Sequence, residues 1–347
     1  MGAQEDIKTL NADNNNVSAK TPHVVTMIEA INLALHRAMN SDSNVVVLGE
    51  DVATNGGVFR ATVGLKEQFG HKRVMDTPLA ETLIAGISVG MAAQKLRPVA
   101  EIQFMGFIYA TMEHIVSHAA RLRNRTRGRL TCPMVLRAPY GGGIHAPEHH
   151  SESTEALFAH IPGIRVVIPS SPTRAYGLLL SAIEDPDPVI FLEPKRIYRM
   201  VKQEIYDDGV GLPLDTCYTL RQGEDITLIS WGAMIHETLQ AATQLKKQGI
   251  SAEVIDVATI SPLDIDTLIA SVQKTGRCII IQEAARHCGV AAEISASLQE
   301  QAFASLLSPI KRITGCDTPM PYLRRENLYM ISSQEIVDAT IKIMEAP

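Results

Sequence analysis

The sequence from residue 76 reads Asp76-Thr77-Pro78-Leu79-Ala80-Glu81 and predicts the beginning of a helix. Thr77 can cap this helix, and Pro78 suits its first position because the N–H that proline lacks would have no partner there. An apolar face follows at helical spacing, made of Leu83, Ile84, Ile87 and Met91. Glu81 therefore lies in the first turn. A carboxylate there complements the positive end of the helix dipole, which explains Glu81 when it is considered alone.

Composition and charge restrict the class of protein. The 347 residues, 46% of them apolar, are enough for two domains with substantial cores. Residues 1–21 are polar and lack the apolar segment and cleavage site of a signal peptide, so we expect a flexible leader. The chain has no apolar run of membrane-spanning length, and its net charge of −6 argues against a nucleic-acid surface. We therefore expect a soluble cytoplasmic protein without membrane or nucleic-acid partners.

The cysteines predict neither disulfides nor a metal site. There are five of them, scattered along the chain without a Cys-x-x-Cys pair or any other ligand spacing. We expect free thiols.

Short β-branched runs alternate with helical patterns, which is typical of parallel α/β architecture. The first set of expected strands covers 44–48, 99–104, 134–137, 165–168 and 189–192, with helices at 27–39, 79–93, 108–123 and 173–184. The second set covers 226–231, 252–257, 277–282 and 310–314, with helices at 234–248, 264–275 and 290–303. We expect two parallel-sheet α/β domains, one over 22–200 and one over 224–347, joined by a turn-rich linker at 201–223.

Two short motifs suggest other enzyme classes, but their context does not support either. Residues 86–90 fit the G-x-S-x-G elbow of α/β-hydrolases, yet Ser88 lies inside a helical apolar pattern and not at a turn after a strand. Residues 141–146 loosely fit a dinucleotide-binding fingerprint, but Pro147 and the acidic, polar segment 148–155 oppose the helix that this fingerprint requires. We expect Gly141–Gly143 to form a flexible loop instead.

Four stretches, taken together, match a known family. They are Gly49-Glu50-Asp51-Val52, Gly56-Gly57-Val58-Phe59-Arg60, residues 76–81, and Glu101-Ile102-Gln103-Phe104-Met105-Gly106-Phe107. In their order and spacing the chain resembles, from about Val24 to its C-terminus, the β subunits of the thiamine-diphosphate-dependent E1 components of 2-oxoacid dehydrogenase complexes. The resemblance implies a pyrimidine-binding domain followed by a transketolase C-terminal-like domain.

The resemblance assigns roles around Glu81. The matching glutamate of the family hydrogen-bonds N1′ of the cofactor's aminopyrimidine, whose exocyclic nitrogen then removes the proton from C2 of the thiazolium. Burial among Leu79, Ile84 and Phe107 would help Glu81 to hold its proton. Glu50 matches an acid beside the catalytic glutamate, and two neighbouring carboxyls raise one another's proton affinity. Leu79 and Phe107 match residues of the pyrimidine pocket. Without the resemblance, Glu50 is equally explained as a solvent-facing strand end and Phe107 as core filling.

Three histidines, His145, His149 and His150, cluster after the glycines. Loop histidines are commonly solvated or structural, and we expect this of His145 first. The resemblance singles out His150, which matches a histidine at the active-site mouth that orients the bound intermediate or assists reductive acylation of the lipoyl group. Other members of the family often carry an apolar residue at the position of His149. Asp185 and Asp187 could form part of a K⁺ site seen in relatives, although a plain turn also explains them.

The chain lacks the Gly-Asp-Gly motif through which thiamine-diphosphate enzymes hold a divalent ion and the diphosphate. The resemblance therefore implies an α2β2 heterotetramer in which an E1 α subunit supplies the Mg²⁺-diphosphate half of the site. The implied reaction decarboxylates a 2-oxoacid and transfers the acyl group to lipoyl on the E2 dihydrolipoyl acyltransferase. The second domain would then contribute to dimerisation and to the E2-binding surface.

Residues 104–107 and 141–153 look more like those of bacterial pyruvate dehydrogenase β chains, so we expect pyruvate as the substrate. The alternative is the branched 3-methyl-2-oxobutanoate, because a pocket discriminates weakly between acids that differ by one or two methylenes. A β-like chain with a purely structural or regulatory role is a further alternative. Loss of Glu81 would have supported that last possibility.

Overall fold

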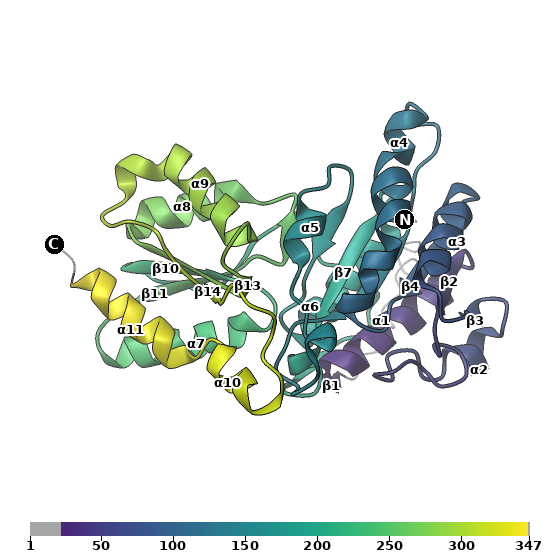
Figure 1. The fold of residues 1–347 in the computed structure, drawn as a ribbon, viewed down its shortest axis with the longest axis horizontal. Coiled ribbons are helices and arrows are strands. Elements are labelled where there is room, and N and C mark those ends of the chain that lie inside the picture. The colour runs from purple at the N-terminus through teal and green to yellow at the C-terminus, as the bar shows by residue number, and fades with distance from the viewer. Residues whose placement is uncertain (1–21, 346–347) are drawn as a thin grey trace, which may run out of the picture.

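The computed structural model describes residues 22–345, so the leader predicted for residues 1–21 lies outside the described residues. Two α/β units lie side by side along the longest axis of the molecule (Figure 1). Each is built on one mainly parallel sheet, which confirms the fold class predicted from the alternation of strands and helices.

The larger sheet has seven strands in the order β12-β6-β7-β5-β4-β2-β3. Its parallel strands are β2 (Val45–Gly49), β3 (Val74–Asp76), β4 (Arg97–Glu101), β5 (Val135–Tyr140), β6 (Arg165–Val167) and β7 (Val189–Pro194). The edge strand β12 (Thr259–Ser261) is antiparallel to β6 and comes from the second half of the chain. The part of the chain that builds the smaller sheet thus contributes one strand to the larger sheet.

Both faces of this sheet are covered, so its central strands are buried on both sides. On one face α1 (Met27–Ser41) packs against α6 (Pro172–Glu184), and on the other lies α3 (Glu81–Ala93). Alternate residues of a strand point to opposite faces. Accordingly, Val47 joins the α1 and α6 core, whereas Leu48 joins the core that contains α3.

The smaller sheet has the order β14-β13-β10-β11-β9. Its strands are β9 (Tyr218–Arg221), β10 (Ile226–Ser230), β11 (Ala252–Asp256), β13 (Cys278–Ala285) and β14 (Lys311–Gly315), and only β9 is antiparallel to its neighbour. Helices α8 (Ile265–Thr275) and α9 (Val290–Ala302) cover one face, and α7 (Met234–Lys247) and α11 (Ser333–Met344) cover the other (Figure 1).

The predicted cap of α3 is wrong. The helix begins at Glu81 after Ala80, which makes no side-chain cap. After β3 the Thr77 N–H still donates to the Gly49 carbonyl across 2.9 Å, so the pairing with the end of β2 continues for one more residue. Thr77 therefore belongs to the end of the sheet, although Glu81 does lie in the first turn as predicted.

The continuous helix predicted over 108–123 is also wrong. The segment is divided into a 3₁₀-helix η1 (Met105–Thr111), a π-helix (Glu113–His118), a second 3₁₀-helix (Ala119–Arg121) and α4 (Leu122–Arg125). At the first break the Thr111 hydroxyl donates to the Ile108 carbonyl three residues earlier, across 2.6 Å. Such local bonds compete with regular helical hydrogen bonding.

Several short edge elements were not predicted from the sequence. The predicted linker 201–223 carries β8 (Lys202–Ile205), which pairs with β1 (His23–Thr26), and also β9. Helix α11 was not predicted either, although its start has a capping box between Ser332 and Glu335. Within residues 22–345, no helix has the length and apolar character needed to cross a membrane.

One buried ion-pair network connects the three central strands of the larger sheet. Arg137 on β5 is 1% exposed. Its Nε lies 2.7 Å from Glu193 Oε1 on β7, and its Nη1 lies 2.9 Å from Glu101 Oε2 on β4. The Tyr198 hydroxyl adds a 2.5 Å hydrogen bond to Glu193. Burial raises the pKa of Glu101, which the guanidinium charge opposes.

The first prediction concerns Arg137→Met. This change leaves Glu101 and Glu193 buried without their cation, so we expect the free energy of unfolding to fall by about 3–5 kcal/mol. Urea denaturation followed by circular dichroism measures the loss. The exposed Arg129→Met serves as the control and should change stability by no more than about 0.5 kcal/mol. Equal stability of the two variants would contradict the network's structural role.

Candidate active site

Three neighbouring strands of the larger sheet end together. Gly49 at the end of β2 is in register with Asp76 on β3 and with Glu101 on β4. In open α/β sheets, ligands bind outside the carboxyl ends of the strands. Glu50 directly follows β2, and Glu81 begins the helix that follows β3. The two carboxyls selected from the sequence therefore lie at the same edge.

Glu50 is buried here, at 4% exposure, which is contrary to the solvent-facing alternative. Its Oε1 has no hydrogen-bond partner. Burial raises the pKa of Glu50, and the negative charge of Glu81 raises it further, while a backbone hydrogen bond with Ala80 opposes both. The two carboxyls thus interact as expected from their predicted proximity. Glu50 can carry a proton closer to neutral pH than an ordinary glutamate can.

The expected burial of Glu81 is only partly correct. Ile84 is buried and Phe107 is half-buried, but Leu79 is 82% exposed. The reason is the late start of α3, because Leu79 lies at a bend before the helix and not on its apolar face. Leu83, in the first turn, is also exposed. Glu81 is therefore half-buried and flanked in sequence by two exposed leucines.

The segment η1 connects α3 to the predicted histidine site. The Thr82 hydroxyl donates to the Ala110 carbonyl across 2.8 Å, which fastens η1 to the first turn of α3. The His150 ring packs edge-on against Phe104 and Phe107, with centroids 4.3 Å and 5.4 Å apart. His150 Nδ1 is buried and has no hydrogen-bond partner. Phe107 and His150, selected separately from the sequence, are thus in contact.

We call residues 141–153 the histidine loop. The flexibility expected for Gly141–Gly143 is wrong, because their backbone is hydrogen-bonded to other parts of the chain. The Gly142 N–H donates to Glu283 across 2.6 Å, and the Gly143 N–H donates to Glu326 across 2.5 Å. His145 also binds Glu326, in agreement with the structural role expected of it. Neither glutamate was predicted from the sequence.

The structure also excludes the hydrolase elbow and the dinucleotide-binding fingerprint as functional sites. Ser88 is buried inside α3, where its hydroxyl donates to the Ile84 carbonyl across 2.7 Å. It is therefore no exposed nucleophile. The glycine loop is followed by a 3₁₀ turn (Glu148–His150) and not by a long helix, and its N–H groups already bind carboxylates. A phosphate would have to displace them.

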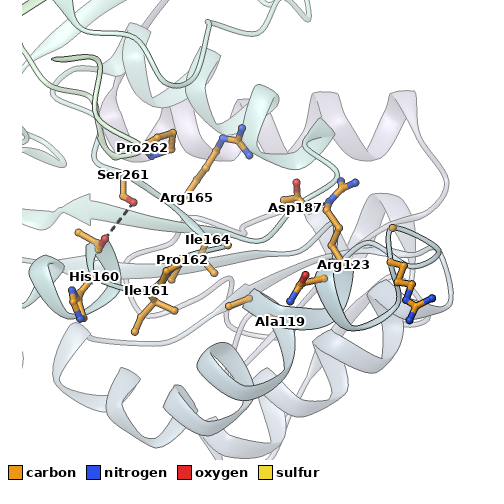
Figure 2. Close-up of a pocket in the computed structure, with 16 residues that line it drawn as sticks. Ala119, Arg123, His160, Ile161, Pro162, Ile164, Arg165, Asp187, Ser261 and Pro262 are labelled. Atoms are coloured by element: carbon orange, nitrogen blue, oxygen red, sulfur yellow. Dashed lines mark hydrogen bonds and ion pairs between the residues drawn. The ribbon is translucent and has the colours of Figure 1, made fainter. Parts of the chain in front are cut away.

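The two aspartates proposed for a cation site have arginine partners. Asp185 pairs with Arg165 at 3.1 Å, and Asp187 pairs with Arg123 at 2.7 Å. Figure 2 shows Arg123, Arg165 and Asp187 lining a cavity of about 810 Å³. Neither Glu50, Glu81 nor His150 lines this cavity. Over residues 22–345, no cluster of three or more His, Cys, Asp or Glu side chains could hold a metal ion.

Comparisons with known proteins show the family and the fold. Residues 23–201 match the family model of the transketolase pyrimidine binding domain, and residues 215–336 match that of the transketolase C-terminal domain. The pyruvate dehydrogenase E1 component subunit beta of Bacillus subtilis (strain 168) is 48% identical over 321 residues, which cover 92% of this chain and 99% of that protein. The protein of the same name from Acholeplasma laidlawii is 48% identical over 323 residues, covering 93% and 99%.

A solved structure supports the fold alone. The split gene transketolase, described as an inactive beta4 tetramer, superposes with a TM-score of 0.74 over 93% of this chain and 99% of that one. The two sequences are 21% identical.

The second prediction concerns the pair of carboxyls. Replacing Glu81 by Gln removes a negative charge beside Glu50, so the pKa of Glu50 should fall. It should stay above the ordinary glutamate value, because burial is the larger cause of its elevation. Infrared difference spectra of carboxyl-labelled glutamate, with Glu50→Gln to assign the band, measure this shift. The exposed Glu113→Gln is the control, and an unchanged Glu50 band in the Glu81 variant would show that the two groups do not interact.

Proposed function

This chain belongs to the family of pyruvate dehydrogenase E1 component β subunits, and from that membership we propose that it is the β half of a thiamine-diphosphate-dependent pyruvate dehydrogenase. The observation that carries the proposal is the pair Glu50 and Glu81 at the carboxyl ends of the strands, one of them buried with an oxygen that lacks a partner. Pyruvate is favoured as the substrate because the relatives at 48% identity bear its name.

The described residues fit the aminopyrimidine half of the cofactor. Glu81 would hydrogen-bond the ring nitrogen N1′, and Phe107 would pack against the ring. When bound, thiamine diphosphate supplies the carbon nucleophile that attacks the 2-oxo group and accepts the electrons left when carbon dioxide departs. Glu50, whose pKa is raised, would share a proton with Glu81. Leu79 is exposed here, so it would line the pyrimidine pocket only when a second chain covers this leucine.

We propose that the second chain is an E1 α subunit in an α2β2 heterotetramer. The sequence has no Gly-Asp-Gly motif, so the Mg²⁺ and the diphosphate would bind to the α subunit. The exposed side chains of Leu79 and Leu83 beside Glu81 offer the apolar surface that such a contact requires. K⁺ near Asp185 and Asp187 stays a prediction, and a cation there would compete with the arginines that pair with both carboxylates. We place this enzyme in the cytoplasm.

His150 is proposed to act in the second half-reaction. Its Nδ1 has no hydrogen-bond partner, and its ring packs against Phe104 and Phe107. Phe107 lies in η1, which is hydrogen-bonded to the first turn of the helix that begins with Glu81. From this position His150 can donate a hydrogen bond to the acyl fragment or a proton to the sulfur of a lipoyl group carried by E2. Phe104 and Phe107 would fix the ring orientation.

The third prediction tests the proposed reaction. The tagged chain is recovered from its own cells with its bound proteins and assayed with thiamine diphosphate and Mg²⁺ on pyruvate beside 3-methyl-2-oxobutanoate. We expect a second subunit, a preference for pyruvate, and no turnover by this chain alone. Glu81→Gln should assemble normally but lose at least about 100-fold in turnover, because general acid–base catalysis contributes about 10²–10⁴-fold.

Other outcomes are equally informative. A preference for the branched acid would move the assignment to a branched-chain 2-oxoacid dehydrogenase. If no partner were recovered and neither acid turned over, a non-catalytic structural or regulatory role would replace the proposal. High activity of Glu81→Gln would remove Glu81 from the mechanism.

The fourth prediction separates the two half-reactions. In the assembled enzyme, His150→Ala should reduce acyl transfer to lipoyl more than it reduces decarboxylation measured with an artificial electron acceptor, because the decarboxylation step uses Glu81. The exposed His160→Ala is the matched control and should leave both rates unchanged. Equal losses in both assays would contradict the assignment of His150 to acyl transfer.

A further inference from the structure

The histidine loop is held by two carboxylates from the second half of the chain. Glu283 on β13 and Glu326 at the start of α10 (Glu326–Tyr329) are 4% and 1% exposed. Glu283 Oε1 accepts the Gly142 N–H at 2.6 Å and the Ser153 hydroxyl at 3.1 Å. Each oxygen of Glu326 accepts one backbone N–H, from Gly143 at 2.5 Å and from His145 at 2.6 Å. Hydrogen bonds to a carboxylate are about twice as strong as neutral ones.

The three glycines fit this arrangement because they lack a Cβ. A Cβ on Gly141 would lie 2.7 Å from Glu283 Oε1, and one on Gly142 would lie 2.5 Å from the terminal methyl of Met320. One on Gly143 would overlap the side chain of Arg196. Gly141 and Gly143 also have φ of +84° and +86°, which favours glycine. The glycines thus allow close approach to the carboxylates.

Positive charge from the first domain lies beside the same carboxylates. Lys195 and Arg196 follow β7, and Arg196 pairs with Glu237 on α7 through two hydrogen bonds of 2.7 Å and 2.8 Å. The Lys195 amino group is buried without a hydrogen-bond partner. Burial lowers its pKa to about 8, although the charges of Glu283 and Glu326 act in the opposite direction. Cations of the first domain and carboxylates of the second therefore lie close together beside the histidine loop.

The other end of the loop packs against η1. A Cβ on Gly106 would overlap the His149 carbonyl oxygen, and the His150 ring contacts Phe104 and Phe107. The Ser151 hydroxyl donates to the Pro147 carbonyl across 3.2 Å, which closes the turn that carries His150. His150 is thus fixed on one side by aromatic rings and on the other by the segment that Glu326 and Glu283 hold.

We propose that Glu326 and Glu283 are positioning residues, through which the second domain sets the orientation of His150 in the first. The part of this inference that concerns His150 rests on the proposed function. The attachment of the loop does not, because it can be measured without any turnover. A purely structural bond between the domains is the competing explanation, and it predicts no selective effect on the half-reaction that uses His150.

The fifth prediction uses the full chain with Glu326→Gln, which keeps the size of the side chain but removes its charge. Hydrogen exchange at Gly143 and His145 should become roughly ten- to a hundredfold faster, and the increase should reach His150. The exposed Glu300→Gln on α9 is the matched control and should leave the loop unchanged. In the assembled enzyme, Glu326→Gln should reduce acyl transfer to lipoyl while decarboxylation with an artificial acceptor is largely retained.

Exchange in the histidine loop equal to that of the Glu300 control would overturn the attachment. Faster exchange could also come with equal losses of rate in both half-reactions, or with no loss of rate. Either result would show that the contact between the domains is only structural and would overturn the positioning role. If the wild-type enzyme decarboxylated neither acid, the proposed function would fail, and the exchange rates would still decide the attachment. Should Glu326→Gln not fold, Glu283→Gln gives the same test at Gly142.

Discussion

A carboxyl group buried at the end of a parallel strand must pair with a cation, accept hydrogen bonds or hold a proton, and this constraint governs the centre of the structure. Arg137 satisfies two such groups, Glu101 and Glu193, and so joins three central strands. Glu50 lies at the same edge, is equally buried, and keeps one oxygen without a partner beside Glu81. Carboxyls that pair with Arg137 therefore stabilise the sheet, whereas the carboxyl of Glu50, which has no cation partner among residues 22–345, is available for proton transfer.

The sequence predicted the parts of the fold that have a strong local signal. Parallel strands covered on both faces read as continuous apolar runs, so β2, β10 and β11 could be located within a residue or two. The edge strands β8 and β12 carry no such signal, because they are short and their pairing depends on partners far along the chain. The beginning of α11 did carry a signal, the capping box of Ser332 and Glu335, that could have been found.

The candidate site divides in the same way. The resemblance located Glu50, Glu81, Phe107 and His150, because each lies in a motif with fixed spacing. It did not locate Glu283 and Glu326, since their partners are backbone N–H groups more than a hundred residues away, and backbone groups leave no trace in a sequence. The triple glycine was a signal for this contact, but glycine indicates close approach as readily as flexibility.

The exposure of Leu79 also explains why catalysis would depend on assembly. A carboxyl that must donate a proton at neutral pH needs an apolar cover, and this chain supplies Ile84 and Phe107 but leaves Leu79 and Leu83 in solvent. In the proposed heterotetramer the α subunit would bury both leucines as it brings the diphosphate and Mg²⁺. The same contact would then exclude water from Glu81 and complete the cofactor site, so that proton transfer begins only where both halves are present.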